Sequence, residues 1–452
     1  MRPRSSLKIF EQHTSGLFLV FVLAAVACGG GGSGNGKPPS ASGGAAKGGS
    51  STASVGGSIS SGGVGAGGSI SSGGAASGGA PGTGGGAELG GSPASGGSGG
   101  GMGGASSSGA SGGAGDTVNA AAMAKAMGFG TNIGNTFDST TGWETGWGQP
   151  LVSQAYIKGM ASRGIKTVRV PVAWDTYAKN GVIDATKLSR VKEVVGWILA
   201  AGMYAIVNIH WDGGWIFNEN KTTAYTLTDD VKSKFASYWK QISAGFSDVG
   251  HMLIFEGLNE EAQFYVNGNS NGTPDIPALN QLNQLFVTTV RAQTGYNTTR
   301  ALLIAGFATD INKTCVDAFT VPTDPAGPGR QFLSIHFYDP YTFTLMEDPA
   351  SWGSPSATWG TDAEKKALTD QFDKLGTFST TKGVPVILGE FAVTRGQKVA
   401  RQAASRILWM ESVAKAMMSH GGVPVLWDTG GEISRSDGSF TTELQTVMND
   451  LK

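Results

Sequence analysis

The sequence predicts an α/β fold, a (β/α)8 TIM barrel preceded by a disordered Gly/Ser-rich linker. Three observations support this prediction: eight short apolar runs occur between residues 116 and 452, segments with helical spacing separate most of them, and polar side chains follow the runs. A short apolar run bounded by turn signals is typical of a buried parallel strand, and strands that alternate with helices form βαβ units. Eight such units close a barrel of about 250 residues or more.

The predicted strands are, in chain order, 128–135, 165–172, 204–209, 252–258, 301–305, 332–337, 384–388 and 423–427. An open doubly wound sheet is the competing architecture. It would favour a glycine-rich phosphate turn after the first strand, and Gly-Thr-Asn-Ile-Gly at 130–134 does not fit the pattern G-x-G-x-x-G. We therefore expect the closed barrel.

Helical spacing is clearest between the second and third predicted strands. In residues 185–199, Leu188, Val191, Val195 and Ile198 keep one face apolar. The same periodicity recurs in later crossovers, at 235–242, 279–290, 363–378, 399–418 and 441–451. Together these segments predict that residues 116–452 form one large α/β domain, the catalytic domain of the protein.

The first 28 residues have the features of an export signal. Arg2, Arg4 and Lys8 precede the apolar run 17–27, which is too short to cross a bilayer permanently. Cys28, with Ala-Val-Ala before it, resembles the lipidated cysteine of a bacterial lipobox, and the alternative is an ordinary secretory signal with an incidental cysteine. We expect an exported protein: an outer-membrane or cell-surface lipoprotein, or a secreted one.

Residues 29–115 consist almost entirely of Gly, Ser and Ala and contain no aromatic residue. Such a segment cannot bury enough apolar surface to offset the entropy lost on ordering. We expect a flexible tether with a root-mean-square reach of about 50 Å. The net charge of the whole chain is -1, so charge offers no argument for nucleic-acid binding, and we expect none. Two cysteines make no disulfide framework.

Polar side chains follow six of the eight predicted strands. They are Arg169 after the second strand, His210 after the third, Asn259 and Glu260 after the fourth, His336 and Tyr338 after the sixth, Glu390 after the seventh and Trp427 after the eighth. The carboxyl ends of barrel strands meet at one mouth, where barrel enzymes keep their chemistry. Each residue alone has a structural explanation, but their joint placement predicts an active site.

Two carboxylates on different strands, without a neighbouring nucleophilic Ser or Cys, are typical of glycoside hydrolysis. One must be protonated and the other ionised, so their environments must differ. Arg169 and Tyr338 are suited to stabilise the ionised partner, and an amide such as Asn259 is suited to a sugar 2-hydroxyl. Trp427 offers a flat face for a pyranose ring. Seven other tryptophans fall in or near the loops above the barrel, and we expect some of them to bind glycan and some to pack in the core: Trp143, Trp147, Trp174, Trp211, Trp215, Trp352 and Trp359.

A metal site is the less favoured interpretation of the same residues. His210, Asp212, His336 and Glu390 offer ligand atoms, but H-E-x-x-H and similar spacings are absent from the sequence. We expect neither a metal nor an organic cofactor.

These residues resemble the signature of glycoside hydrolase family 5, the large cellulase family of retaining (β/α)8 enzymes. The resemblance extends over residues 127–427 and includes all eight signature positions. It implies that Glu260, in Leu-Asn-Glu, is the acid/base and that Glu390, in Leu-Gly-Glu-Phe, is the nucleophile. It implies a supporting set composed of Arg169, His210, Asn259, His336, Tyr338 and Trp427.

The loop motifs resemble subfamily 4, which holds endo-β-1,4-glucanases and xyloglucanases. The motifs are Asn-Ile-Gly-Asn-Thr-Phe-Asp at 132–138, Glu-Thr-Gly-Trp-Gly at 144–148 and His-Phe-Tyr-Asp-Pro-Tyr at 336–341. Two residues depart from the family pattern. Trp211 stands where members often have a second histidine, and we expect it to alter glucan contacts near the cleavage point. Glu261 stands where most members have proline, and we expect it to raise the pKa of the adjacent acid.

The resemblance implies a retaining endoglucanase that cleaves β-1,4-glucan, with carboxyl groups roughly 5 Å apart. The alternatives are the same chemistry on xyloglucan, mannan, lichenan or xylan, and a catalytically inactive surface glycan-binding protein. The presence of both glutamates argues against the inactive protein. We expect a monomer whose partner is a β-glucan polysaccharide or oligosaccharide, with membrane contact only through a lipid anchor.

Overall fold

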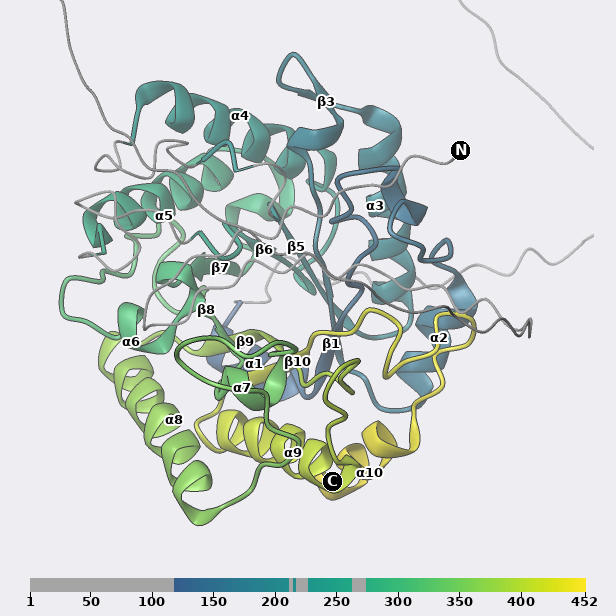
Figure 1. Cartoon of the computed structure of the whole chain (residues 1–452). Coiled ribbons are helices and arrows are strands. Elements are labelled where there is room, and N and C mark those ends of the chain that lie inside the picture. The colour runs from purple at the N-terminus through teal and green to yellow at the C-terminus, as the bar shows by residue number, and fades with distance from the viewer. Residues whose placement is uncertain (1–117, 211–213, 217–226, 262–273) are drawn as a thin grey trace, which may run out of the picture. The chain divides into compact units, whose positions relative to one another are not determined.

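The computed structural model describes residues 118–210, 214–216, 227–261 and 274–452. Within them, eight parallel strands form a closed barrel in the order β1-β10-β9-β8-β7-β6-β5-β2, with helices around the ring of strands (Figure 1). The predicted (β/α)8 fold is confirmed. The expected signal segment with Cys28, the linker 29–115, and residues Trp211 and Asp212 lie outside the described residues.

All eight predicted strands are present. Their bounds are β1 (Gly130–Asn132), β2 (Thr167–Val170), β5 (Tyr204–Asn208), β6 (Leu253–Glu256), β7 (Leu302–Ala305), β8 (Gln331–Phe337), β9 (Val386–Phe391) and β10 (Val423–Leu426). Each is buried along its length except the first residue of β5, which explains why these strands appear in the sequence as continuous apolar runs rather than as alternating patterns.

The helices are α1 (Ala120–Met127), α2 (Gln154–Ser162), α3 (Ala185–Ala200), α4 (Asp229–Gly245), α5 (Ile276–Arg291), α6 (Ile311–Thr314), α7 (Tyr341–Thr344), α8 (Asp362–Lys382), α9 (Ala403–Ser419) and α10 (Thr442–Asp450). Short 3-10 turns occur at Trp143–Thr145, Asp175–Tyr177, Gly295–Thr298 and Phe307–Thr309. In this part of the chain, no helix has the length and apolar character needed to span a bilayer.

Capping residues explain where α8 begins and ends. The Thr361 side chain accepts from the backbone N–H of Glu364, whose carboxylate accepts from the backbone of Thr361, and Gly383 follows the helix in the left-handed conformation. The helix therefore extends beyond the predicted bounds of 363–378. In contrast, α9 begins four residues later than predicted, because Gln402 uses its backbone N–H to contact the carbonyl of Ala357.

A small hairpin that the strand prediction did not include extends from the segment between β2 and α3. It comprises β3 (Ala178–Lys179) and β4 (Val182–Ile183), which pair antiparallel. Asn180 and Gly181 connect them with φ angles of 54° and 74°, the left-handed geometry of a type I′ turn. The Asn-Gly dipeptide is a recognised sequence signal for such a turn.

Two apolar layers hold the barrel together. The larger layer lies between the strands and the outer helices; in it, the Trp239 ring of α4 lies 5.5 Å from Phe255 and 4.5 Å from Phe286. The smaller layer lies inside the barrel and combines side chains of α1 with inward-facing side chains of the strands. The α1 residues are Ala120, Ala124 and Met127, and the strand residues are Ile206, Ile254, Leu303, Phe332, Ile387, Val423 and Val425. Because α1 precedes β1 and packs on these side chains, it closes the amino end of the barrel and leaves the carboxyl end for chemistry.

Candidate active site

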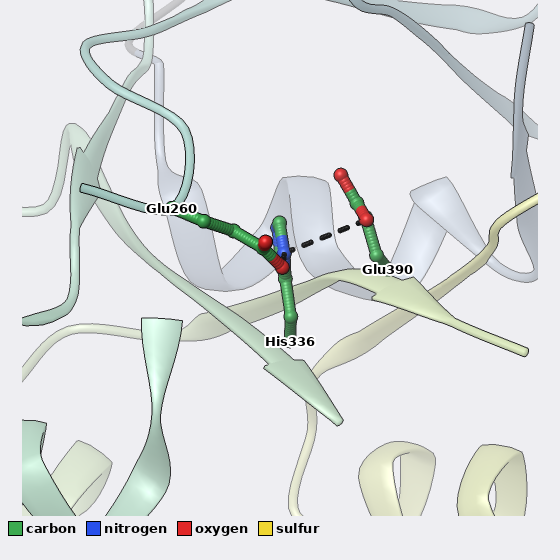
Figure 2. Close-up of side chains that lie close together, drawn as sticks. All are labelled: Glu260, His336 and Glu390. Atoms are coloured by element: carbon green, nitrogen blue, oxygen red, sulfur yellow. Dashed lines mark hydrogen bonds and ion pairs between the residues drawn. The ribbon is translucent and has the colours of Figure 1, made fainter. Parts of the chain in front are cut away.

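The polar residues predicted at the strand ends meet at the carboxyl end of the barrel. Arg169 belongs to β2, His336 to β8 and Glu390 to β9, while Glu260 follows β6. Figure 2 shows His336 between the two glutamates. A carboxylate oxygen of Glu260, one of Glu390 and a ring nitrogen of His336 all lie within 4.8 Å of one another, which matches the separation expected of the carboxylate pair.

Arg169 is the centre of a buried hydrogen-bond network and is 0% exposed. Its Nη1 donates to Oε1 of Glu390 at 2.8 Å, and its Nη2 donates to Oδ1 of Asn259 at 2.7 Å. Its Nε donates to Oε2 of Glu256 at 2.6 Å. The guanidinium therefore ties strands β2, β6 and β9 together in one fixed arrangement.

Glu390 is held as a charge-stabilised carboxylate. Besides the bond from Arg169, its Oε2 accepts from the Tyr338 hydroxyl at 2.9 Å. Burial raises the pKa of Glu390, and the positive charge of Arg169 and the hydrogen bond from Tyr338 oppose that rise. Burial, with the nearby carboxylates, raises the pKa of Tyr338 well above its ordinary value, so this phenol stays protonated and donates.

Glu260 lies in a different environment. Its Oε1 is 2.6 Å from Nδ1 of His336, and its side chain is 21% exposed against 7% for Glu390. Burial raises the pKa of Glu260 to about 7; Arg169 opposes this rise and the charge of Glu256 adds to it. Glu260 therefore retains a proton near neutral pH, which a general acid requires.

His336 is neutral between the two glutamates because burial lowers its pKa to about 4. Its Nε2 is buried and has no hydrogen-bond partner among the described residues. A buried lone pair without a partner costs less than a buried N–H without one, so we place the ring proton on Nδ1. The Nδ1–H group then donates to Oε1 of Glu260, and the other oxygen of that carboxyl group is left to carry the acid proton.

An irregularity in strand pairing aims His336 and Glu390 into the same space. The register of β8 and β9 shifts between Ile335 and His336, so that His336 pairs with Glu390 and Gly389 is the extra residue. A Cβ atom on Gly389 would lie 2.9 Å from Nε2 of His336. The Leu-Gly-Glu motif therefore needs glycine because the imidazole lies directly over its backbone.

His210 and Trp427 form a flat-sided pair at the same mouth. Their rings are nearly parallel, 6° apart, with centroids separated by 5.9 Å. Burial lowers the pKa of His210 well below its ordinary value. The Asn208 amide donates to Nδ1 of His210 at 3.2 Å, which leaves the ring proton on Nε2. A neutral ring with an N–H donor, beside a partly exposed indole, is suited to sugar hydroxyls.

Four polar residues of the site were not predicted. Glu256 and Ser334 are fully buried in β6 and β8, and Asn132 and Asn208 occupy the ends of β1 and β5. Asn132 accepts from Arg169 at 3.0 Å and donates to the Gly389 carbonyl at 2.8 Å. The sequence signal that could have identified them is a polar residue inside or at the end of an apolar run, as in Leu-Ile-Phe-Glu of β6.

The loop tryptophans differ in their placement. Trp174 is 1% exposed and donates to the Asn208 carbonyl at 2.8 Å, so it belongs to the core. Trp352 is 42% exposed and lies 5.8 Å from the ring of Tyr341. Glu261 is buried beside the acid, and its expected effect on that acid's pKa stays a prediction.

One group in the described part of the chain has the composition of a metal site. It consists of Glu260, His336 and Glu390, and it does not include His210. Its members already bond to each other, to Arg169 and to Tyr338, so the same atoms are explained by the requirements of an acid and a nucleophile.

Comparison with known proteins gives a consistent result. The family model for cellulases, glycosyl hydrolase family 5, matches residues 127–432. Endoglucanase B of Clostridium cellulovorans is 32% identical over 330 residues, covering 72% of this chain and 71% of that protein. A xyloglucan-specific endo-β-1,4-glucanase of Bacteroides ovatus is 32% identical over 335 residues, covering 70% and 65%.

The fold agrees with solved structures as well. A broad-specificity endoglucanase of family 5 subfamily 4, from an uncultured bovine rumen ciliate, has a TM-score of 0.65 and 30% sequence identity, with 74% of this chain and 98% of that chain covered. The similarity spans the whole barrel and the relatives are named hydrolases. This chain is therefore a glycoside hydrolase that belongs to family 5, the cellulase family, with relatives of the subfamily 4 endoglucanase type.

Proposed function

We propose that this protein is a retaining endo-β-1,4-glucanase that acts by double displacement. The observation that carries the proposal is the closeness of two unlike carboxyl groups: one oxygen of Glu260 and one oxygen of Glu390 lie within 4.8 Å of each other. Retaining enzymes have separations of about 5–5.5 Å, whereas inverting enzymes need about 6.5–9.5 Å to admit a water molecule.

In the first step, Glu390 attacks the anomeric carbon while Glu260 gives its proton to the departing glycosidic oxygen. The carbon–oxygen bond to the leaving glucan breaks, and an ester between Glu390 and the sugar forms. The ion pair from Arg169 and the hydrogen bond from Tyr338 keep Glu390 ionised before attack.

In the second step, Glu260 is a carboxylate and accepts a proton from water. The hydroxide attacks the anomeric carbon from the face that the leaving group vacated, and Glu390 is released. Two inversions give net retention. Loss of the charge on Glu390 in the intermediate lowers the pKa of Glu260, because a neighbouring negative charge raises that pKa and is now removed.

Asn259 is the proposed contact for the sugar 2-hydroxyl. Its Oδ1 accepts from Arg169 at 2.7 Å, which determines which side of the amide presents its N–H donors. A hydrogen bond to the 2-hydroxyl strengthens as the oxocarbenium-like transition state forms. We propose that Trp427 and His210 line the same sugar-binding position.

The test is turnover of soluble polysaccharides by the purified protein. We expect release of reducing ends from β-1,4-glucan, no turnover by Glu390→Ala, and a product whose first-formed anomer is β by proton NMR. An initial α product would exclude the double displacement. Equal, near-zero rates for wild type and Glu390→Ala would favour a glycan-binding protein instead.

Xyloglucan is the second candidate substrate, because one of the relatives is named as xyloglucan-specific. A panel of β-glucan, xyloglucan, lichenan, mannan and xylan separates these possibilities by relative kcat/KM. A preference of more than tenfold for xyloglucan, about 1.4 kcal/mol in transition-state binding, would reassign the main substrate.

We also propose that the protein is exported and anchored by a lipid on Cys28, with residues 29–115 as a tether. The support is the basic, apolar and small-residue order of the first 28 residues. Cys28→Ser should move the protein from the membrane fraction to the soluble fraction after export. Equal membrane association of both forms would exclude the anchor.

A further inference from the structure

A third buried carboxylate lies beneath the catalytic pair and has no part in the two steps above. Glu256 ends strand β6 and is 0% exposed. Its Oε2 accepts from Nε of Arg169 at 2.6 Å, and its Oε1 accepts from the Ser334 hydroxyl at 2.7 Å. Both oxygens are therefore engaged by groups on β2 and β8, strands that do not neighbour β6 in the barrel.

The geometry of Arg169 transmits the position of Glu256 to the nucleophile. A guanidinium group is planar, and its five N–H donors have fixed directions relative to one another. Once Nε is bonded to Glu256, rotation of the group is restrained, and Nη1 points at Oε1 of Glu390 at 2.8 Å. Without that restraint, the group would keep bonds only along its Nη edge, to Asn132, Glu390 and Asn259.

We infer that Glu256 is a positioning residue, which acts through Arg169 to hold the Glu390 carboxylate in its attacking orientation and places a negative charge on the strand that leads to Glu260. This inference rests on the proposed double displacement. Ser334 completes the arrangement, because its hydroxyl restrains the second oxygen of Glu256.

The charge effect follows from the surroundings of Glu260. The charge of Glu256 adds to the rise that burial causes in the pKa of Glu260, and it partly opposes the fall that burial causes in the pKa of His336. It also shares the positive charge of Arg169 with Glu390. Within the described part of the chain, the charged or titratable groups around Glu260 are Arg169 on β2, Glu256 on β6, His336 on β8 and Glu390 on β9, with Glu261 next in the chain and Tyr338 directly after β8.

The substitution that tests this role is Glu256→Gln. Gln has the same shape; its carbonyl can accept from Nε of Arg169, and its amide can donate to the Ser334 hydroxyl oxygen, whose own hydrogen must then turn to another acceptor. The main losses are the negative charge, the charge-assisted bond to Arg169 and the acceptor of the Ser334 hydroxyl. We expect kcat to fall about tenfold or more, and both limbs of the pH profile to move to lower pH by about half a unit or more.

Two variants separate positioning from stability. Asp324→Asn is the matched control, because Asp324 is a buried carboxylate that accepts bonds of 2.7 and 2.8 Å from Arg291 and precedes β8, at the amino end of the barrel. Asp324→Asn should lower the melting temperature and leave the acidic and alkaline limbs of the pH profile unchanged. Ser334→Ala keeps the charge of Glu256 but frees its Oε1, so kcat should fall severalfold while the limbs stay in place.

The decisive measurement is a titration of the Glu260 carboxyl carbon by 13C NMR in wild type and Glu256→Gln, with Glu260→Gln to assign the signal. We expect a lower midpoint in Glu256→Gln. This titration needs no substrate, so it tests the inference even if the wild type hydrolyses none of the glucans and the proposed function fails. An unchanged midpoint in folded Glu256→Gln would overturn the inference, as would wild-type kcat in Ser334→Ala if Glu256→Gln does not fold.

Discussion

Nδ1 of His336 lies 2.6 Å from Oε1 of Glu260 and 3.7 Å from Oε2 of Glu390. The same imidazole thus bonds to one carboxyl group and only approaches the other, whose charge is instead matched by Arg169 at 2.8 Å. A neutral donor holds the acid and a cation holds the nucleophile. This asymmetry is what gives two glutamates in one cavity different protonation states.

The first prediction concerns the alkaline side of the pH profile. Burial raises the pKa of Glu260 to about 7, and the acid must be protonated in the free enzyme before the first step. We therefore expect kcat/KM to fall above about pH 7, tenfold for each further pH unit. The measurement is kcat/KM between pH 4 and 9 on a soluble glucan; a profile that stays flat to pH 9 would exclude Glu260 as the acid.

The second prediction is that Glu260→Gln stabilises the protein at alkaline pH. The pKa of Glu260 is about 7 in the folded protein, above its ordinary value of 4.5, so the folded state binds this proton more tightly than the unfolded state does. Its contribution to the free energy of unfolding is therefore greatest at low pH and is lost as pH rises from 4.5 towards 7, by up to about 3 kcal/mol. Thermal melts should give equal midpoints near pH 4 and a higher midpoint for Glu260→Gln at pH 8. A difference in melting temperature between Glu260→Gln and wild type that stays constant with pH would contradict this prediction.

The third prediction concerns His336. Replacement by Ala removes the group that orients Glu260, so kcat should fall about 100-fold. Replacement by Asn places an amide near the position of Nδ1 and should recover about tenfold of that loss. Steady-state kinetics of the two variants check this, with melting temperatures as a control for folding. If His336→Asn and His336→Ala have equally low kcat, the hydrogen bond between His336 and Glu260 is not the contact that matters for catalysis.

The fourth prediction is that Gly389→Ala impairs catalysis. The added Cβ would lie 2.9 Å from Nε2 of His336, so the ring must leave its position over the Gly389 backbone. We expect kcat to fall about tenfold or more. The matched control is Gly196→Ala in α3, where an added Cβ meets nothing within 4 Å; it should leave kcat unchanged and raise stability by about 0.5–1 kcal/mol.

The fifth prediction concerns the sugar-binding face of Trp427. Its ring is parallel to that of His210 at 5.9 Å and is partly exposed. Trp427→Ala should lower kcat/KM about 10–100-fold, and Trp427→Phe should lower it less because part of the flat face remains. Kinetics on soluble glucan and on a short oligosaccharide check this; equal kcat/KM for wild type and Trp427→Ala would remove Trp427 from the binding site.

Much of the fold could be predicted because a barrel strand is buried on both sides. A strand such as β7, Leu-Leu-Ile-Ala, is apolar throughout and stands out in the sequence. The helix ends were less predictable, since they depend on single capping residues such as Thr361 and Gly383. The β3–β4 hairpin carried a short Asn-Gly signal that the apolar pattern does not register.

By itself, the sequence determined the barrel and the residues that face its mouth, because strand direction in a (β/α)8 fold sends every strand end to the same side. Tertiary structure alone decided the chemistry of each group. Glu256, Glu260 and Glu390 are the same residue type, yet Arg169 and Ser334 hold the first, His336 the second, and Arg169 and Tyr338 the third. Those partners come from strands far apart in the chain, and burial and charge at close range, which no local pattern encodes, set which carboxyl group carries the proton.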